Sequence, residues 1–219
     1  MIYIKMVDKV IIFCAHSDDE VLAAGGTIAK YTQEGKEVII VIFSYGEASN
    51  PIVQDQVIIN ERIKEADKIG EFLGIKEVIF LGIVDGRIYE KINDRKFLGR
   101  ISDIIKKYEP KRIFTHAGND PHRDHRSVNK IVVKVIDSMK EKYDVFTFDV
   151  WNIINVFRKT KPELYVDTSD TFDKKLNALK LFESQQVYVN ALLPSILFNA
   201  KLNGSKINCK YAERFLKVR

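Results

Sequence analysis

The chain has 219 residues, 46% hydrophobic and 30% charged, which suits one large globular domain with a sizeable core. Its net charge is +5, but the basic residues are scattered without a run of five, so we expect a solvated surface and no nucleic-acid partner. The sequence lacks a long apolar run, signal-peptide features and a Cys-x-x-Cys pattern. It therefore predicts no transmembrane helix and no thiolate zinc site, and we expect a cytoplasmic protein.

Apolar runs alternate with amphipathic segments along the chain. Apolar runs predict strands at 10–15, 37–43 and 77–81. Further strands are predicted at 112–115, at 144–150, where apolar and polar residues alternate, and at 164–166. The amphipathic segments predict helices at 21–33, 57–73, 97–108, 127–139 and 172–183. The rest, 188–219, looks less regular, and its apolar stretch 191–198 can pack on the core or on a second subunit, as in a homo-oligomer. The alternation predicts one α/β domain over 1–219, Rossmann-like, with three α/β/α layers and a mainly parallel sheet.

One stretch combines the end of a buried strand with dense charge. Residues 15–20 read Ala-His-Ser-Asp-Asp-Glu and follow the first apolar run directly. A histidine and three carboxylates this close together are unfavourable unless water or a cation neutralises them. The carboxyl end of a strand is also where open α/β sheets bind their ligands. We interpret this stretch as half of a metal site.

The histidines supply the other half. The chain has four, all just beyond predicted strands: His16, His116, His122 and His125. Loops at the carboxyl ends of parallel strands converge on one edge of the sheet, so the first and fourth loops can meet. A catalytic zinc ion takes three protein ligands from nitrogen and carboxylate oxygen donors. His16, Asp19 and a histidine of the second loop satisfy that requirement.

The spacing of the His and Asp residues within each loop predicts different roles for neighbouring side chains. His122 and His125 are three residues apart at a predicted helix start, so one can bind metal while the other faces the substrate. Asp18 and Asp19 are adjacent and should point in different directions, which allows one to ligate and the other to act as a base. Asp124 can hold a ring N–H of a neighbouring histidine. We expect Glu20 to serve the start of the following helix or to orient a ligand.

These motifs resemble the PIG-L/LmbE-like family of zinc-dependent N-acetylglucosaminyl de-N-acetylases. That family carries Ala-His-Pro-Asp-Asp-Glu after its first strand and a later His-x-Asp-His, matched here by 15–20 and 122–125. Weaker family features extend the resemblance over nearly the whole chain: Gly25-Gly26, Gly46-Glu47, Arg62 and Glu65, Ala178-Leu179, Ser184-Gln185, and Tyr-Ala-Glu-Arg-Phe at 211–215. Two positions depart from the pattern, since Ser17 replaces Pro and Phe182 replaces the His of many members.

The resemblance implies that His16, Asp19 and His125 bind Zn²⁺, or another divalent transition metal such as Fe²⁺. It implies that Asp18 is the general base and that His122, in its protonated form, stabilises the oxyanion. Asp124 would then orient His125 or tune His122. We count Asp124 with the catalytic residues for that reason.

Three further residues are candidates for contacts with sugar hydroxyls: Arg62, Glu47 and Asp85. Arg62 is read equally well as an ordinary surface residue of a helix. The implied reaction removes acetyl from an N-acetylglucosamine-type sugar and releases acetate and a free amine. Two alternatives stay open, a zinc-dependent amidase acting on a non-sugar amide and a non-catalytic, metal-dependent sugar-binding protein. A dinucleotide-binding protein is disfavoured because no Gly-rich phosphate loop follows the first strand.

Overall fold

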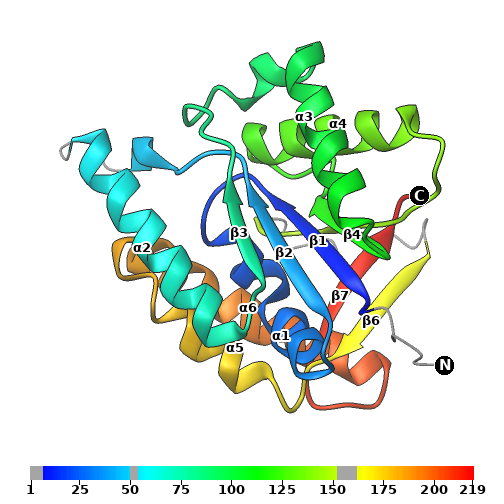
Figure 1. The fold of residues 1–219 in the computed structure, drawn as a ribbon. Helices are drawn as coiled ribbons and strands as arrows, with labels where there is room; N and C mark the ends of the chain where they lie inside the picture. The colour runs from blue at the N-terminus through cyan, green and yellow to red at the C-terminus, as the bar shows by residue number, and fades with distance from the viewer. Residues whose placement is uncertain (1–6, 50–53, 152–161) are drawn as a thin grey trace, which may run out of the picture.

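The computed structural model describes residues 7–49, 54–151 and 162–219. Its strands form one seven-stranded sheet in the order β3-β2-β1-β4-β5-β7-β6 (Figure 1). The strands are β1 (Lys9–Cys14), β2 (Glu37–Ile42), β3 (Glu77–Phe80), β4 (Arg112–His116), β5 (Asp144–Phe148), β6 (Glu163–Asp167) and β7 (Ala212–Lys217). Neighbouring strands pair in parallel except at β7, which is antiparallel to both β5 and β6. The α/β class and the mainly parallel sheet are confirmed.

Helices cover both faces of the sheet and complete three layers (Figure 1). The α-helices are α1 (Asp19–Gln33), α2 (Asp55–Leu73), α3 (Arg95–Tyr108), α4 (Arg123–Ser138), α5 (Phe172–Leu179) and α6 (Gln186–Lys206). Three short 3₁₀ turns are η1 (Glu47–Ser49), η2 (Ile88–Lys91) and η4 (Glu183–Gln185). One core cluster lies between the sheet and α1, α2, α5 and α6, and the other lies between the sheet and α3 and α4. Within the described residues, no helix is long and apolar enough to cross a membrane.

The central strand shows why the apolar runs are continuous. β1 pairs with β2 on one side and β4 on the other, so that Ile12 lies between Ile40 and Phe114. Alternate residues of β1 point to opposite faces, with Ile12 in one core cluster and Phe13 in the other. Because helices bury both faces, every position of β1 from Val10 to Cys14 carries an apolar side chain.

The C-terminal region differs from the expectation. Residues 188–219 are not irregular, because they form most of α6 and all of β7. Pro194 lies inside α6, and the apolar residues of this helix do not follow one face, which hid the helical period. Leu192 packs in the core, whereas Phe198 keeps 61% of its surface exposed. The predicted helix at 172–183 is also too long, since α5 ends at Leu179 and η4 follows.

The start of α4 lies earlier than expected and matters for the site. The helix begins at Arg123 rather than near 127, and His122 occupies its N-cap position. The loop from β4 to α4 therefore delivers His122 and His125 together at the carboxyl edge of the sheet. The loop from β1 to α1 leaves the same edge, as the parallel pairing of β1 and β4 requires.

Candidate active site

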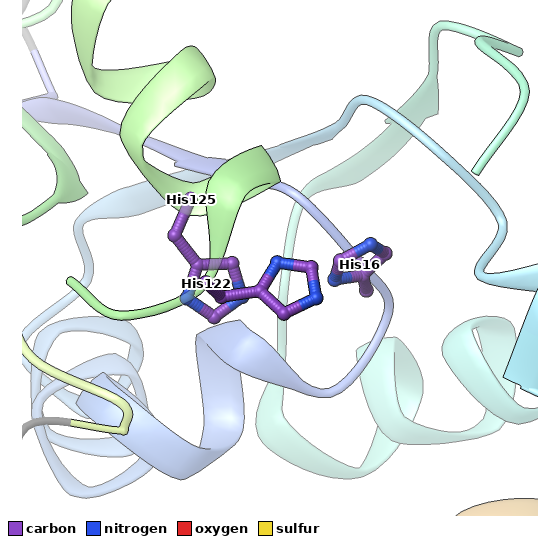
Figure 2. A group of neighbouring side chains, drawn as sticks. All are labelled: His16, His122 and His125. Atoms are coloured by element: carbon purple, nitrogen blue, oxygen red, sulfur yellow. The ribbon is translucent and has the colours of Figure 1, made fainter. Parts of the chain in front are cut away.

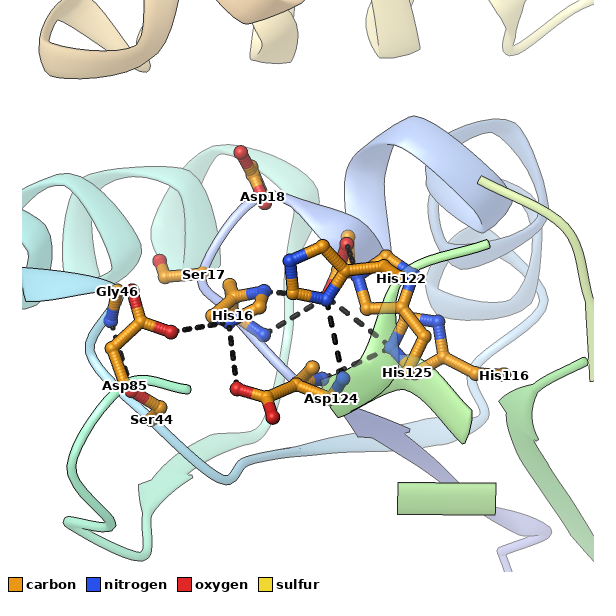
Figure 3. A network of polar contacts seen from close by, with 12 residues as sticks. His16, Ser17, Asp18, Ser44, Gly46, Asp85, His116, His122, Asp124 and His125 are labelled. Atoms are coloured by element: carbon orange, nitrogen blue, oxygen red, sulfur yellow. Dashed lines mark hydrogen bonds and ion pairs between the residues drawn. The ribbon is translucent and has the colours of Figure 1, made fainter. Parts of the chain in front are cut away.

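The turn between β1 and α1 separates two adjacent aspartates. Asp19 belongs to the first turn of α1, and its Oδ2 accepts the backbone N–H of His16 at 2.9 Å. Asp18 is the N-cap residue, but its side chain makes no capping hydrogen bond and lies apart from the histidine rings (Figure 3), on the wall of the same cleft. The expected divergence of the two carboxylates is therefore present. Glu20 is buried, and its Oε2 accepts the N–H of Asp18 at 3.2 Å, which orders this turn.

Three histidine rings from the two loops converge on one point (Figure 2). Asp19 lies between two of them: its Oδ1 is 3.3 Å from Nε2 of His125, and its Oδ2 is 3.8 Å from Nδ1 of His16. The ring of His122 lies beside both, with ring centroids 5.2 Å from His16 and 4.7 Å from His125. The structure thus brings together the three residues that the sequence nominates as metal ligands.

His116 belongs to the same cluster, although the sequence assigned it no role. Its Nε2 lies 3.2 Å from Oδ2 of Asp19 and accepts the N–H of Ala15 at 3.0 Å. Its ring stacks on His125 with centroids 3.9 Å apart. Burial and the charge of His125 lower its pKa to about 4, so the ring is neutral at pH 7. A histidine that ends a buried strand beside two motifs rich in His and Asp is the signal that could have identified it.

The carboxylate beside His125 is Asp120, and this corrects the expected orienting role of Asp124. Oδ1 of Asp120 lies 3.1 Å from Nδ1 of His125 and accepts the N–H of His122 at 2.8 Å. Asp124 is buried on the other side, where its Oδ2 accepts the N–H of Gly86 at 2.8 Å and lies 3.8 Å from Nε2 of His16. Adjacent residues at a helix start point in different directions, so proximity in sequence to His125 was misleading.

Two of the three expected sugar-contacting residues face a cleft beside the histidines, and one does not. The cleft is lined by His16, Asp18, Asp19, Leu22, Gly46, Ala48, Arg62, Asp85, His122, His125, Trp151, Gln185 and Tyr188. Arg62 is a buried residue rather than a surface one, and its guanidinium donates to the Ser17 carbonyl at 2.7 Å and lies 3.9 Å from Oδ2 of Asp18. Oδ1 of Asp85 lies 3.0 Å from Nε2 of His16 (Figure 3).

Glu47 is the exception, because it is not among the residues that line the cleft. Its Oε1 accepts the N–H of Asp85 at 2.8 Å and its Oε2 accepts the hydroxyl of Ser44 at 3.3 Å. Both carboxylate oxygens are thereby used to join the loops that follow β2 and β3. Phe182, at the position where the sequence departs from the family pattern, is fully buried in the core and does not reach the cleft.

The charges of the cluster favour a cation at its centre. Burial opposes protonation of His16, but the carboxylates of Asp124 and Asp85 outweigh it and raise the pKa of the ring to about 10. Burial likewise opposes protonation of His125, and the charges of Asp19 and Asp120 raise its pKa to about 9. Burial would raise the pKa of Asp19, but the imidazoles of His125 and His116 hold that pKa well below its usual range. Imidazole nitrogens and carboxylate oxygens around one point are suitable ligands for a divalent transition metal.

Comparison with known proteins identifies the family. A sequence model of the family described as GlcNAc-PI de-N-acetylase, PIG-L, matches residues 11–136, which is more than half of the chain and includes both histidine motifs. The chain belongs to the PIG-L family. This PIG-L member is 30% identical over 184 residues to the probable N-acetyl-alpha-D-glucosaminyl L-malate deacetylase 2 of Bacillus cereus, covering 80% of the chain and 83% of the relative.

A second relative and a solved structure are also similar to this chain. Diacetylchitobiose deacetylase of Thermococcus kodakarensis is 25% identical over 225 residues, covering 94% of this chain and 82% of the relative. The structure of N,N'-diacetylchitobiose deacetylase from Pyrococcus horikoshii, in complex with its inhibitor MPG, superposes with a TM-score of 0.81. That comparison covers 96% of this chain and 84% of the other at 22% identity, and it shows that this PIG-L member shares the fold.

Proposed function

We propose that this PIG-L member is a zinc-dependent N-deacetylase that removes the acetyl group from an N-acetylglucosamine-type sugar or glycoconjugate. The observation that carries the proposal is geometric. Asp18 and His122 face the same cleft in which Asp19 lies between His16 and His125. The names of the two relatives, deacetylases of N-acetylglucosaminyl malate and of diacetylchitobiose, support the substrate class.

His16, Asp19 and His125 would hold the metal ion. Their donor atoms suit Zn²⁺ and also accept Fe²⁺. The neighbouring carboxylates, which raise the pKa of both rings to about 10 and about 9, favour positive charge at this point, and a divalent cation meets that requirement. When bound, such an ion supplies Lewis acidity that activates water and polarises the acetamide carbonyl.

Asp18 is the general base. Its carboxylate faces the cleft, and burial together with the charge of Asp19 raises its pKa, which increases its ability to take up a proton. Asp18 accepts a proton from the attacking water as the new C–O bond forms. It returns that proton to the amide nitrogen as the C–N bond breaks. The acetyl group leaves as acetic acid, which ionises to acetate, and the sugar keeps a free amine.

His122 acts as a neutral donor, which revises the protonated ring expected from the sequence. Burial and the charge of His125 lower the pKa of His122. Its Nδ1 accepts the N–H of Asp124 at 3.3 Å, so the ring proton is assigned to Nε2. From Nε2 the ring donates a hydrogen bond to the oxyanion of the tetrahedral intermediate. Loss of one such donor typically reduces the rate by about 10²–10³-fold.

The remaining wall of the cleft suits a carbohydrate. Trp151 and Tyr188 contribute aromatic surface, and Gln185 and Arg62 contribute hydrogen-bonding groups. Aromatic rings pack against the apolar faces of a pyranose, while amide and guanidinium groups bind its hydroxyls. This combination favours a sugar amide over a simple acyl amide.

Acetate release from a defined panel tests the proposal. The purified protein, loaded with Zn²⁺, is incubated with N-acetylglucosamine, its glycosides, N,N'-diacetylchitobiose and several non-sugar N-acetyl amines. We expect acetate from at least one sugar and none after the metal is removed by a chelator. Acetate only from non-sugar amides would replace the proposal with an amidase. Stable binding of a sugar without turnover would replace it with a sugar-binding protein.

A further inference from the structure

A buried carboxylate from the C-terminal strand reaches the middle of helix α1. Oε1 of Glu213 in β7 accepts the backbone N–H of Gly26 at 3.1 Å, and its Oε2 accepts the N–H of Thr27 at 2.7 Å. Backbone N–H groups inside a helix rarely meet a carboxylate, because the helix directs them to its own carbonyls. Glu213 therefore anchors α1 at a defined height above the sheet.

Lys175 of α5 contacts both Glu213 and helix α1. Its Nζ donates to Oε1 of Glu213 at 2.7 Å and to the backbone carbonyl of Leu22 at 2.8 Å. Both charged side chains are almost fully buried, with 3% of Lys175 and 5% of Glu213 exposed. A buried ion pair seldom adds net stability over apolar residues of similar size. Its presence here calls for a role other than stability.

The glycine pair of α1 makes the approach possible. A Cβ on Gly25 would lie 2.9 Å from Cγ of Lys175, and a Cβ on Gly26 would lie 2.9 Å from Cβ of Thr168. Any larger residue would push α1 away from α5 and from the loop that follows β6. Thr171 adds a further contact, since its hydroxyl donates to the Gly26 carbonyl at 2.8 Å. Figure 1 shows α1 on the same face of the sheet as α5 and α6.

The anchor lies about one helical turn from the site. Leu22, whose carbonyl Lys175 holds, also lines the cleft. Its own N–H donates to the Asp18 carbonyl at 2.9 Å, and the N–H of Val21 donates to the same carbonyl at 3.1 Å. The first turn of α1 is therefore fixed between Lys175 and Asp18, and Asp19 is part of that turn.

We propose that the buried Lys175–Glu213 pair positions the first turn of α1, and through it the carboxylates of Asp18 and Asp19 in the site. Neither Lys175 nor Glu213 reaches the reacting atoms, so both are positioning residues rather than catalytic ones. Their effect on catalysis rests on the proposed deacetylase function. Their effect on the geometry of the site does not.

The test compares two variants of the full-length protein with a matched control. Lys175→Met removes the contact with the Leu22 carbonyl at nearly constant volume. The double variant Lys175→Met/Glu213→Gln removes the unpaired charge as well, so it keeps a foldable core where the single variant could fail. Thr32→Val is the control, because it removes the 2.7 Å hydrogen bond from Thr32 to the Leu73 carbonyl at the far end of the same helix.

Three measurements separate positioning from a merely structural role. The first is affinity for Zn²⁺ by chelator competition, and the second is the visible spectrum of the Co²⁺-loaded protein, which reports ligand geometry. We expect a loss of affinity of about tenfold or more and an altered spectrum in both Lys175 variants, with neither change in Thr32→Val. The third is amide hydrogen exchange of residues 15–24, expected to be faster in the Lys175 variants and unchanged in the control.

With an active substrate, kcat should fall by about 10²-fold with little change in KM, because a displaced base affects the chemical step more than binding. Lys175 variants with wild-type metal affinity, Co²⁺ spectrum and exchange would overturn the positioning role. If the wild type releases no acetate, the deacetylase function fails, while affinity, spectrum and exchange still decide the positioning role. If the wild type binds no metal, the exchange measurement alone decides it.

Discussion

Oδ1 of Asp120 lies 3.1 Å from Nδ1 of His125 and thereby determines which edge of that ring faces the site. The opposite nitrogen, Nε2, lies 3.3 Å from Oδ1 of Asp19. A carboxylate behind a metal-binding histidine orients the ring and raises its basicity. We therefore expect Asp120 to orient His125 in the site, although Asp120 contacts neither the proposed metal position nor the cleft.

Asp120→Asn removes the charge behind His125 but keeps an oxygen that can accept the N–H of His122. We expect Zn²⁺ affinity to fall by about 10–100-fold, measured by competition with a chelator of known affinity. Asp137→Asn is the matched control, because Asp137 lies in the last turn of α4, the helix that carries His125, and pairs with Arg219. Equal affinity of Asp120→Asn and wild type would remove Asp120 from the site.

Substitutions of the two adjacent aspartates should have different effects on activity and metal content. Asp18→Asn should lower the rate of acetate release by about 10²–10⁴-fold. The variant should still bind one equivalent of metal, because only the base is lost. Asp19→Asn should lose the metal, because a ligand between His16 and His125 is replaced. Metal content by elemental analysis and acetate release are measured on the same samples. Metal loss in Asp18→Asn with retention in Asp19→Asn would reverse the two assignments.

Metal binding should release protons. The pKa of His16 is raised to about 10 and that of His125 to about 9, so both rings carry a proton at pH 7 in protein stripped with a chelator. A ligating imidazole must be neutral, so affinity should rise as the pH increases from 7 and level off above about 10. Calorimetry in buffers of different ionisation enthalpy counts the released protons. Binding heats that are independent of the buffer would contradict this prediction.

The stability of the stripped protein should fall as the pH rises from 7 to 10. His16 and His125 have raised pKa values, and burial raises the pKa of Glu20 to about 8. A group with a raised pKa contributes stability that is complete below its unfolded-state pKa and is lost as the pH passes its folded-state pKa. Thermal unfolding midpoints across this range provide the measurement. In the Zn²⁺-bound protein, His16 and His125 should no longer contribute to the decrease of the unfolding midpoint as the pH rises.

Gly26→Ala and Gly99→Ala should have opposite effects. A Cβ at position 26 would lie 2.9 Å from Thr168, so Gly26→Ala should destabilise the protein by about 1–3 kcal/mol. A Cβ at position 99, on the exposed face of α3, meets nothing within 4 Å, so Gly99→Ala should stabilise by about 0.5–1 kcal/mol. Urea unfolding gives both values. Equal changes in the two variants would show that helix propensity alone decides them.

Much of the site could be read from local patterns. The strand that ends before His16 is a continuous apolar run, a second strand is predicted directly before His116, and parallel strands place their carboxyl ends at one edge. That rule placed His16 and Asp19 beside a histidine of the second loop, and the resemblance to the family indicated His125; the three side chains lie together in the structure. The sequence also predicted that the side chains of Asp18 and Asp19 diverge, because adjacent residues at a helix start face different directions.

Two expected contacts, that of Glu47 with the cleft and that of Asp124 with His125, are absent for one physical reason. Glu47 and Asp124 stand beside functional positions in sequence, but their carboxylates are used by the N–H groups of Asp85 and Gly86 in another loop. Asp120 has no motif of its own, and its role depends on the path of a loop between β4 and α4. Side-chain direction in loops is decided by long-range hydrogen bonds, which leave no periodic signal in the sequence.

The sequence by itself determined the alternation of strands and helices and the two histidine motifs, and through them the resemblance to the family. These are local properties, carried by apolar runs and by residue types at short spacing. Only the tertiary structure decided that α6 forms despite Pro194, that β7 enters the sheet between β5 and β6, and that Glu213 reaches Gly26 across 187 positions. Each of these depends on packing between distant segments, whose free energy is not encoded in any single stretch of the chain.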